Sequence, residues 1–221
     1  MKIAVIGAGA MGSIYASFLA KSNNDVLAID LWEEHLNEIK KNGLRVSGFS
    51  GDNNVKNIKV SNNIEDAKEY DLYIIATKAS GVGPVASKLS KIISKEAIIL
   101  TIQNGLGAGE RIASYMPTDN ILLGVAQGFG ASMKGPGHAH HNNMSMIRIG
   151  EMNGGISTRL NDLVKLWCDA GFNAKAFGDI EQLIWEKFIC NVAYSGSCSI
   201  FKKKVGEVID NEHMYTIAKG C

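Results

Sequence analysis

The stretch KIAVIGAGAMGSIY, residues 2–15, decides how the chain folds. Its first five residues form a short apolar run, which is typical of a strand buried on both faces. Gly7, Gly9 and Gly12 follow at the spacing G-x-G-x-x-G, and the residues after them continue in a helical pattern. A strand, a glycine-rich turn and a helix in this order predict the first turn of a dinucleotide-binding Rossmann domain.

Each glycine of this turn has a physical reason to be there. Gly7 permits the tight turn, Gly9 lets the backbone approach a pyrophosphate, and Gly12 lets the helix pack closely on the strand. Free N–H groups and the helix dipole would hold the negative charge. A glycine turn without a ligand is the alternative, but the strand before it and the helix after it favour a ligand. The predicted cofactor-binding residues of the loop are Gly7, Ala8, Gly9, Ala10, Met11 and Gly12.

A second cofactor contact is predicted at the end of the next strand-like run, residues 25–30. Asp30 follows the first glycine at about the twenty-residue distance at which an acid binds the adenosine ribose hydroxyls and repels a 2′-phosphate. This position favours NAD, although Lys78 is a candidate to reach the phosphate region. Asp30 also has a structural interpretation, as the N-cap of the helix expected over residues 32–43.

The rest of the chain alternates between strand and helix patterns, which predicts an α/β fold with a doubly wound parallel sheet. Residues 44–63 break the alternation and predict a small antiparallel insertion. Further strands, separated by helices, are expected at residues 71–77, 97–105, 120–126, 144–150 and 172–178.

Strand patterns end at Asp179, and only helices are expected beyond it, over residues 180–196 and near residues 207–220. Two helical elements cannot close a core by themselves. We therefore expect a dinucleotide-binding Rossmann domain over residues 1–178. Residues 179–221 would be the start of an all-helical substrate or dimerisation domain that is truncated.

Composition limits the class of protein. Of the 221 residues 46% are hydrophobic, and the net charge of +1 gives no electrostatic footprint for nucleic acid or an anionic membrane. The four cysteines form no CxxC pair, which favours free thiols in a reducing compartment. The first apolar run passes into the glycine loop without a signal-peptide cleavage site, and no run has the roughly 18 apolar residues of a membrane span. A soluble cytoplasmic protein with a small-molecule partner is expected.

Residues 184–195, IWEKFICNVAYS, carry polar groups on an otherwise apolar helix face. Lys187 and Asn191 are four residues apart, so they stack on one face, and Ser195 extends that face by another turn. A snorkelling lysine is the structural interpretation of this pattern, with its stem buried and its charge in water.

Four motifs together resemble the ketopantoate reductase (2-dehydropantoate 2-reductase) family. They are GAGAMG at 7–12, TK at 77–78, QNG at 103–105, and W-E-K-F-x-x-N at 185–191. The resemblance implies a Rossmann domain, a helical domain and an active site in the cleft between them. It also implies NADPH-dependent reduction of 2-dehydropantoate to pantoate, in pantothenate and coenzyme A biosynthesis.

The resemblance assigns roles to several residues. Lys187 matches the general acid that protonates the carbonyl oxygen as hydride reaches the keto carbon, and Asn191 matches a substrate-binding asparagine. Asn104 would lie near the nicotinamide and the substrate. Ser195 is a third expected substrate contact, although many relatives carry asparagine there.

Two departures from the family leave alternatives. Full-length members continue past this chain, and their tail carries a serine and a glutamate of the substrate and cofactor sites. Either the chain is truncated, with a cofactor-binding remnant without turnover as one alternative, or a partner supplies the missing residues. Asp30 without a following arginine resembles the NAD-using branch of D-2-hydroxyacid dehydrogenases, which is another. An incomplete helical domain would also expose apolar surface, which leads to the hypothesis of a homodimer.

The histidines of GHAHHNN invite a metal interpretation, because closely spaced imidazoles on a strand can converge on one ion. Their residues are His138, His140 and His141. No nearby cysteine or acid completes a ligand set before Glu151, so we expect no metal and a solvated loop or strand edge.

Overall fold

The computed structural model describes residues 1–221 and divides them into two compact units. Unit 1 comprises Met1–Gln103 and Gly107–Ile180, and unit 2 comprises Asn104–Leu106 and Glu181–Cys221.

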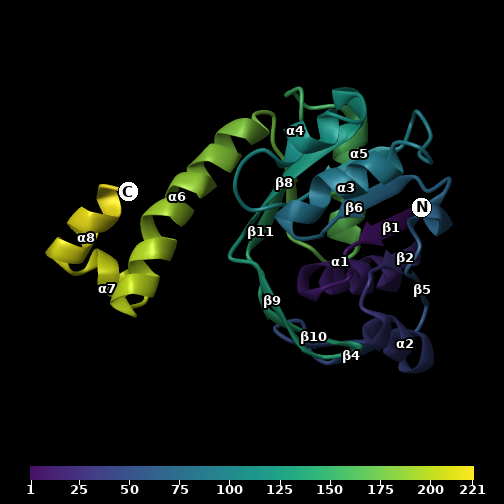
Figure 1. Cartoon of the computed structure of the whole chain (residues 1–221), viewed down its shortest axis with the longest axis horizontal. Helices are drawn as coiled ribbons and strands as arrows, with labels where there is room; N and C mark the ends of the chain where they lie inside the picture. Colours follow the sequence, from purple (N-terminus) through teal and green to yellow (C-terminus); the bar gives the residue numbers. More distant parts are fainter. The chain divides into compact units, whose positions relative to one another are not determined.

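An eight-stranded sheet runs through unit 1 in the order β12-β11-β8-β7-β6-β1-β2-β5 (Figure 1). Every neighbouring pair is parallel except β8 with β11, which confirms the predicted doubly wound parallel sheet. The antiparallel pair arises where the connection, residues 128–145, contains no crossover helix. The strands are β1 (Lys2–Ile6), β2 (Asp25–Ile29), β5 (Ile58–Ser61), β6 (Leu72–Ile75), β7 (Ile98–Thr101), β8 (Ile121–Gln127), β11 (Met146–Glu151) and β12 (Ala174–Ala176).

Helices cover both faces of this sheet. The connection from β1 to β2 and the connection from β6 to β7 travel in opposite directions, so right-handed crossovers place α1 and α3 on opposite faces. Tyr15 of α1 and Trp167 of α5 meet edge to face with ring centroids 5.3 Å apart, so α5 shares the face of α1. The helices are α1 (Ala10–Lys21), α2 (Glu33–Asn42), α3 (Ala79–Leu89), α4 (Ala108–Ala113) and α5 (Thr158–Asp169), with 3₁₀ turns at Ile64–Ala67 and Thr118–Asn120.

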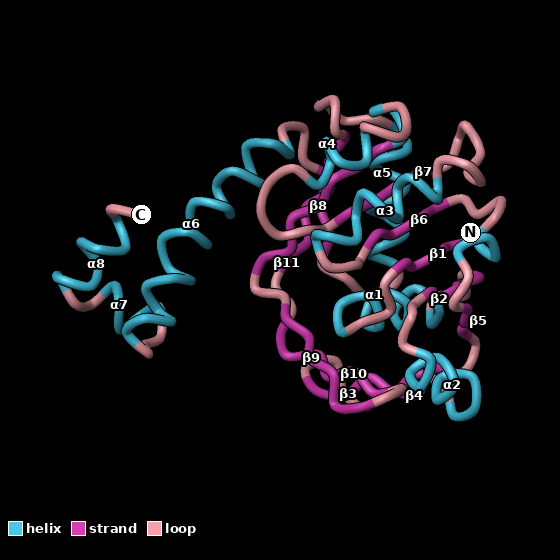
Figure 2. The backbone as a smooth tube through the Cα atoms, in the orientation of Figure 1, coloured by secondary structure: helices cyan, strands magenta, loops and turns pink.

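A second sheet of four strands, in the order β4-β3-β10-β9, packs against α1 (Figure 2). Its strands are β3 (Leu44–Gly48), β4 (Asn53–Val55), β9 (Gly130–Gly135) and β10 (His138–Asn143). The insertion predicted over 44–63 is therefore only partly correct: β3 and β4 are antiparallel, but β5 joins the main sheet beside β2. The edge groups of β3 find their partner about ninety residues away in β10, a pairing that no local pattern specifies.

The histidine-rich segment is an interior strand of this second sheet, so the expectation of a solvated loop or edge is wrong. His141 is fully buried among the rings of Phe18, Phe49 and Phe129, and burial lowers its pKa. His138 and His140 both contact the Ser47 hydroxyl, at 2.8 and 3.2 Å. No group of three histidine, cysteine or acidic side chains in the chain is placed to hold a metal ion.

A half-buried ion pair ties β11 to the start of α5. Arg159 Nε lies 2.9 Å from Glu151 Oε1, and the same oxygen accepts the Ser157 hydroxyl at 2.5 Å. Burial alone would raise the pKa of Glu151, but the hydrogen bonds from Arg159 and Ser157 and the arginine charge outweigh it and lower that pKa. The carboxylate therefore stabilises the fold at neutral pH, and this contribution is lost as the pH falls through the lowered pKa.

Replacing Arg159 with methionine should reduce the free energy of unfolding by about 1–3 kcal/mol near pH 7, because the buried carboxylate loses two donors. The difference from the unsubstituted chain should shrink in acid, where Glu151 is protonated in both. Urea unfolding at neutral and acidic pH measures both effects. Lys165→Met breaks an exposed pair with Asp169 on the same helix and should change nothing measurable. If the loss of unfolding free energy in Arg159→Met were the same at neutral and acidic pH, the prediction would be contradicted.

Unit 2 contains α6 (Ile180–Phe201, whose first residue belongs to unit 1), α7 (Val205–Ile209) and α8 (Glu212–Lys219). The single helix expected near residues 207–220 is two helices. Asn211 explains the break, because its side-chain oxygen accepts the backbone N–H of Met214 at 3.1 Å and so caps a new helix. Among all the helices, none combines the length and apolarity that a membrane span requires.

Candidate functional site

The predicted cofactor residues of unit 1 lie just beyond the carboxyl ends of neighbouring strands of the main sheet. The chain leaves β1 toward β2 on one side and leaves β6 toward β7 on the other, so the strand order reverses between β1 and β6. Ligands of open parallel sheets bind beyond the carboxyl ends of the strands at such a point. Gly7 follows β1, Asp30 follows β2, Thr77 and Lys78 follow β6, and Gln103 follows β7.

The glycine loop has the tight geometry that its spacing predicts. Gly7 adopts a φ of 95° and donates to the Ile29 carbonyl at 2.8 Å, so the loop turns sharply beside β2. A Cβ on Gly12 would lie 2.0 Å from the Gly7 carbonyl oxygen, which no side chain tolerates. A Cβ on Gly9 would meet nothing within 4 Å. Gly7 and Gly12 are thus required by the fold itself, whereas Gly9 keeps a space clear.

The start of α1 fits an anion. Gly9 is its N-cap and offers no side-chain cap, and the first turn contains no acidic residue. The first N–H groups of a helix need partners outside it, and the helix dipole makes this end favourable for negative charge. With the space beside Gly9, these features match a pyrophosphate.

The Asp30 side chain is held at the end of β2 by the backbone of the two residues that follow it. One carboxylate oxygen accepts the N–H groups of Leu31 and Trp32, at 2.8 and 3.0 Å. The N-cap position of α2 is Trp32, so the interpretation of Asp30 as the helix cap is wrong by two residues. Leu31, where an arginine would meet a 2′-phosphate, is 86% exposed.

Two residues of the TK and QNG motifs, Thr77 and Gln103, were given no role from the sequence but hold the neighbouring loops. Gln103 Nε2 donates to the Thr77 carbonyl at 2.8 Å, which joins the loop after β7 to the loop after β6. The backbone of Thr77 in turn packs against Gly7, where an added Cβ would lie 2.7 Å from the Thr77 nitrogen. The predicted Lys78 is exposed at the N-cap of α3. The QNG motif was the available signal for Gln103.

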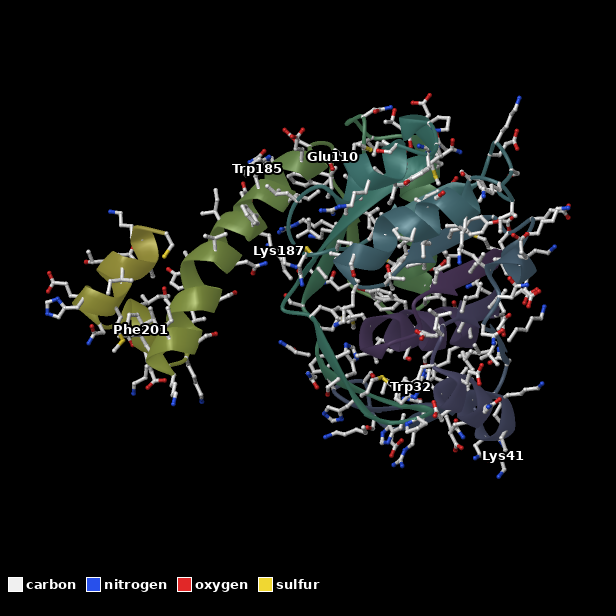
Figure 3. The ribbon with its side chains drawn as sticks, in the orientation of Figure 1. Trp32, Lys41, Glu110, Trp185, Lys187 and Phe201 are labelled. Atoms are coloured by element: carbon white, nitrogen blue, oxygen red, sulfur yellow. The ribbon has the colours of Figure 1, made fainter.

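Unit 2 carries the other predicted residues. Lys187 is half-buried on α6 (Figure 3), and burial lowers the pKa of its ammonium group. Asn191, one turn further, is also half-buried, whereas Ser195 is exposed. Asn104 is exposed and groups with unit 2. Lys187 and Asn191 therefore share one face, as predicted, and exposure increases toward Ser195.

Unit 2 has a groove on a different face of α6 from the face that carries Lys187 and Asn191. The groove, of about 440 Å³, is lined mainly by apolar side chains of α6 and α8, but not by Lys187 or Asn191. The residues that define it are Trp185, Phe188, Ile189, Val192, Tyr215 and Ala218. This groove is therefore distinct from the polar face that carries the lysine.

Comparisons with known proteins agree with the arrangement. A family model described as "Ketopantoate reductase PanE/ApbA" matches residues 3–154, and the model of its C-terminal part matches residues 179–221. A 2-dehydropantoate 2-reductase of Streptococcus pyogenes is 32% identical over 212 residues, which are 96% of this chain and 68% of the relative.

Solved structures are similar over the whole chain. The 2-dehydropantoate 2-reductase from Geobacter metallireducens superposes with a TM-score of 0.91 at 26% identity, over 100% of this chain and 72% of that one. A D-mandelate dehydrogenase solved with NADH and anilino(oxo)acetate has a TM-score of 0.87 at 28% identity, over 99% of this chain and 70% of that one.

Proposed function

The chain belongs to the ketopantoate reductase family, and from this premise we propose that it reduces 2-dehydropantoate to pantoate with a reduced nicotinamide dinucleotide. The observation that carries the proposal is the uncapped start of α1, with the clear space beside Gly9, at the point where the strand order reverses. An anion site at such a reversal, formed by a G-x-G-x-x-G turn that opens a helix, is the arrangement that binds the pyrophosphate of a dinucleotide.

The residues of unit 1 would hold the cofactor as follows. The backbone of residues 7–12 would bind the pyrophosphate, Asp30 the adenosine ribose, and Lys78 the phosphate region. Asn104 would contact the nicotinamide and the substrate. When bound, the reduced nicotinamide supplies the hydride that goes to the keto carbon.

Lys187 would then act as the general acid. Hydride addition builds negative charge on the carbonyl oxygen, and a positioned ammonium stabilises that charge and gives it a proton. The lowered pKa of Lys187 brings this proton transfer closer to neutral pH. Asn191 and Ser195 would bind the substrate through its hydroxyl or carboxylate without adding charge.

The cofactor preference has arguments on both sides. The family resemblance favours NADP(H). Asp30, followed by the exposed Leu31, favours NAD(H), because a carboxylate repels a 2′-phosphate. The likeness to D-mandelate dehydrogenase, solved with NADH, supports a second candidate function, an NAD-dependent D-2-hydroxyacid dehydrogenase.

The loss of reduced-nicotinamide absorbance tests the proposal. The purified chain is mixed with NADPH or NADH and with ketopantoate, phenylglyoxylate or pyruvate. We expect ketopantoate to be reduced fastest. Faster turnover of phenylglyoxylate with NADH would favour the second candidate instead. Tight dinucleotide binding with no turnover of any keto acid would mean that the chain binds cofactor only.

We also propose that unit 2 mediates a homodimer. Ile189 and Ile217 of α6 and α8 are 62% and 55% exposed, which leaves apolar surface on the helices. Sedimentation velocity should show a dimer that Ile189→Glu with Ile217→Glu converts to a monomer. Ile156→Glu, at an equally exposed isoleucine of unit 1, should leave the dimer intact. A monomeric unsubstituted chain at working concentrations would refute this proposal.

A further inference from the structure

A chain of buried hydrogen bonds ends on the glycine loop. His35 of α2 is fully buried, and its Nδ1 accepts the backbone N–H of Gly137 at 2.9 Å. Its Nε2 lies 3.3 Å from the hydroxyl of Ser13 on α1, which donates to the Ala8 carbonyl at 2.8 Å. Three segments far apart in sequence are thereby connected: the turn between β9 and β10, the helix α2, and the loop of residues 7–12.

The direction of every bond in this chain is fixed by chemistry. A backbone N–H can only donate, so Nδ1 of His35 must be unprotonated, and the ring hydrogen of the neutral imidazole is on Nε2. Nε2 therefore donates to Ser13, whose single hydrogen is left for Ala8. Trp32 stacks on the imidazole with ring centroids 5.0 Å apart, which holds the ring plane in place.

The last bond sets the orientation of one peptide unit. The Ala8 carbonyl and the Gly9 N–H belong to the same planar trans peptide, so they point in opposite directions. When Ser13 holds the carbonyl, the N–H is directed away from it. We propose that His35 is a positioning residue for the dinucleotide, acting through Ser13 to orient the Ala8–Gly9 peptide toward the pyrophosphate. This inference rests on the proposed function, because it requires that a dinucleotide binds the loop.

The alternative is a buried histidine that only supports the fold. Both views expect a cost in stability when His35 is replaced, so stability does not separate them. They differ in which ring nitrogen of His35 is required. Positioning requires the Nε2 donor that reaches Ser13, whereas support of the turn at Gly137 requires the Nδ1 acceptor.

Substitution of His35 by asparagine or by glutamine tests the two ring nitrogens separately. The oxygen of asparagine can replace Nδ1 but supplies no donor at Nε2, and the amide nitrogen of glutamine can replace Nε2. Calorimetric titration of each full-length variant with NADH and NADPH gives the affinity. We expect His35→Asn and Ser13→Ala each to weaken binding by about three- to tenfold, the value of one neutral hydrogen bond. Both substitutions break the same relay, the chain of hydrogen bonds from His35 through Ser13 to Ala8. The double variant should therefore bind the dinucleotide no more weakly than either single variant.

His35→Gln should regain most of the affinity, while His141→Gln, at an equally buried histidine outside the relay, should bind like the unsubstituted chain. Equal affinities of His35→Asn and His35→Gln, or additive losses in the double variant, would overturn the inference alone. Failure of the unsubstituted chain to bind either dinucleotide would overturn the proposed function and this inference with it.

Discussion

Replacing Lys187 with methionine should lower kcat for keto acid reduction by about 10²–10⁴-fold, the contribution of a positioned general acid. Methionine keeps an apolar stem of similar length, so the packing of α6 should be retained. The loss should therefore appear chiefly in kcat, with a much smaller effect on the melting temperature. Steady-state kinetics and thermal unfolding of the same preparation measure both quantities.

The pH profile provides an independent check on this role. Only the ammonium form can donate a proton, so kcat should fall as the pH rises through the pKa of Lys187. Because burial lowers that pKa, the fall should begin below the pH at which an ordinary lysine titrates. Lys203→Ala removes an exposed lysine of unit 2 that pairs with Glu207 and should leave kcat unchanged. A snorkelling Lys187 would instead give a methionine variant with full activity.

Gly9→Ala and Gly12→Ala should both weaken dinucleotide binding, for different reasons. At Gly12 the new methyl would lie 2.0 Å from the Gly7 carbonyl oxygen, so the loop must deform, at a cost of about 1–3 kcal/mol in stability. At Gly9 the methyl meets no protein atom within 4 Å, and φ is −68°, so the fold should be nearly unaffected. The methyl would nevertheless occupy the space that the pyrophosphate needs.

The expected loss of affinity for Gly9→Ala is at least about tenfold, or 1.4 kcal/mol, at an almost unchanged melting temperature. Titration calorimetry with NADH and NADPH, beside a thermal melt, distinguishes the two variants. Gly206→Ala in α7 adds a methyl that also meets nothing within 4 Å, and it should change neither quantity by much. Normal dinucleotide affinity in Gly9→Ala would show that the loop does not contact the pyrophosphate.

The main sheet and the family could be predicted from the sequence because their signals are local. The run at residues 2–6 and the glycines after it specify a strand, a turn and a helix within a few residues of one another. The family resemblance, confirmed by the comparisons, rests on motifs that are likewise short and contiguous. A local signal can also be missed. Asn211 caps a new helix and so divides a segment that the sequence pattern predicted as a single helix.

The second sheet and the relay could not be predicted, because their partners are far apart in the chain. His138 pairs in register with Arg45, and the imidazole of His35 meets the N–H of Gly137. A histidine-rich segment is predicted to be solvated as long as the strands that pair with it are not known. For this segment the residue types alone therefore suggested a metal or a surface, where the fold places the buried ring of His141.

Transfer of deuterium from cofactor to product tests the central claim most directly. The chain is incubated with ketopantoate and NADPH or NADH deuterated at both C4 positions, and the product is analysed by mass spectrometry. The proposed reaction predicts pantoate that carries a single deuterium on the former keto carbon, formed by the unsubstituted chain and not by Lys187→Met. Unlabelled pantoate, or no pantoate from a chain that binds the dinucleotide, would contradict it.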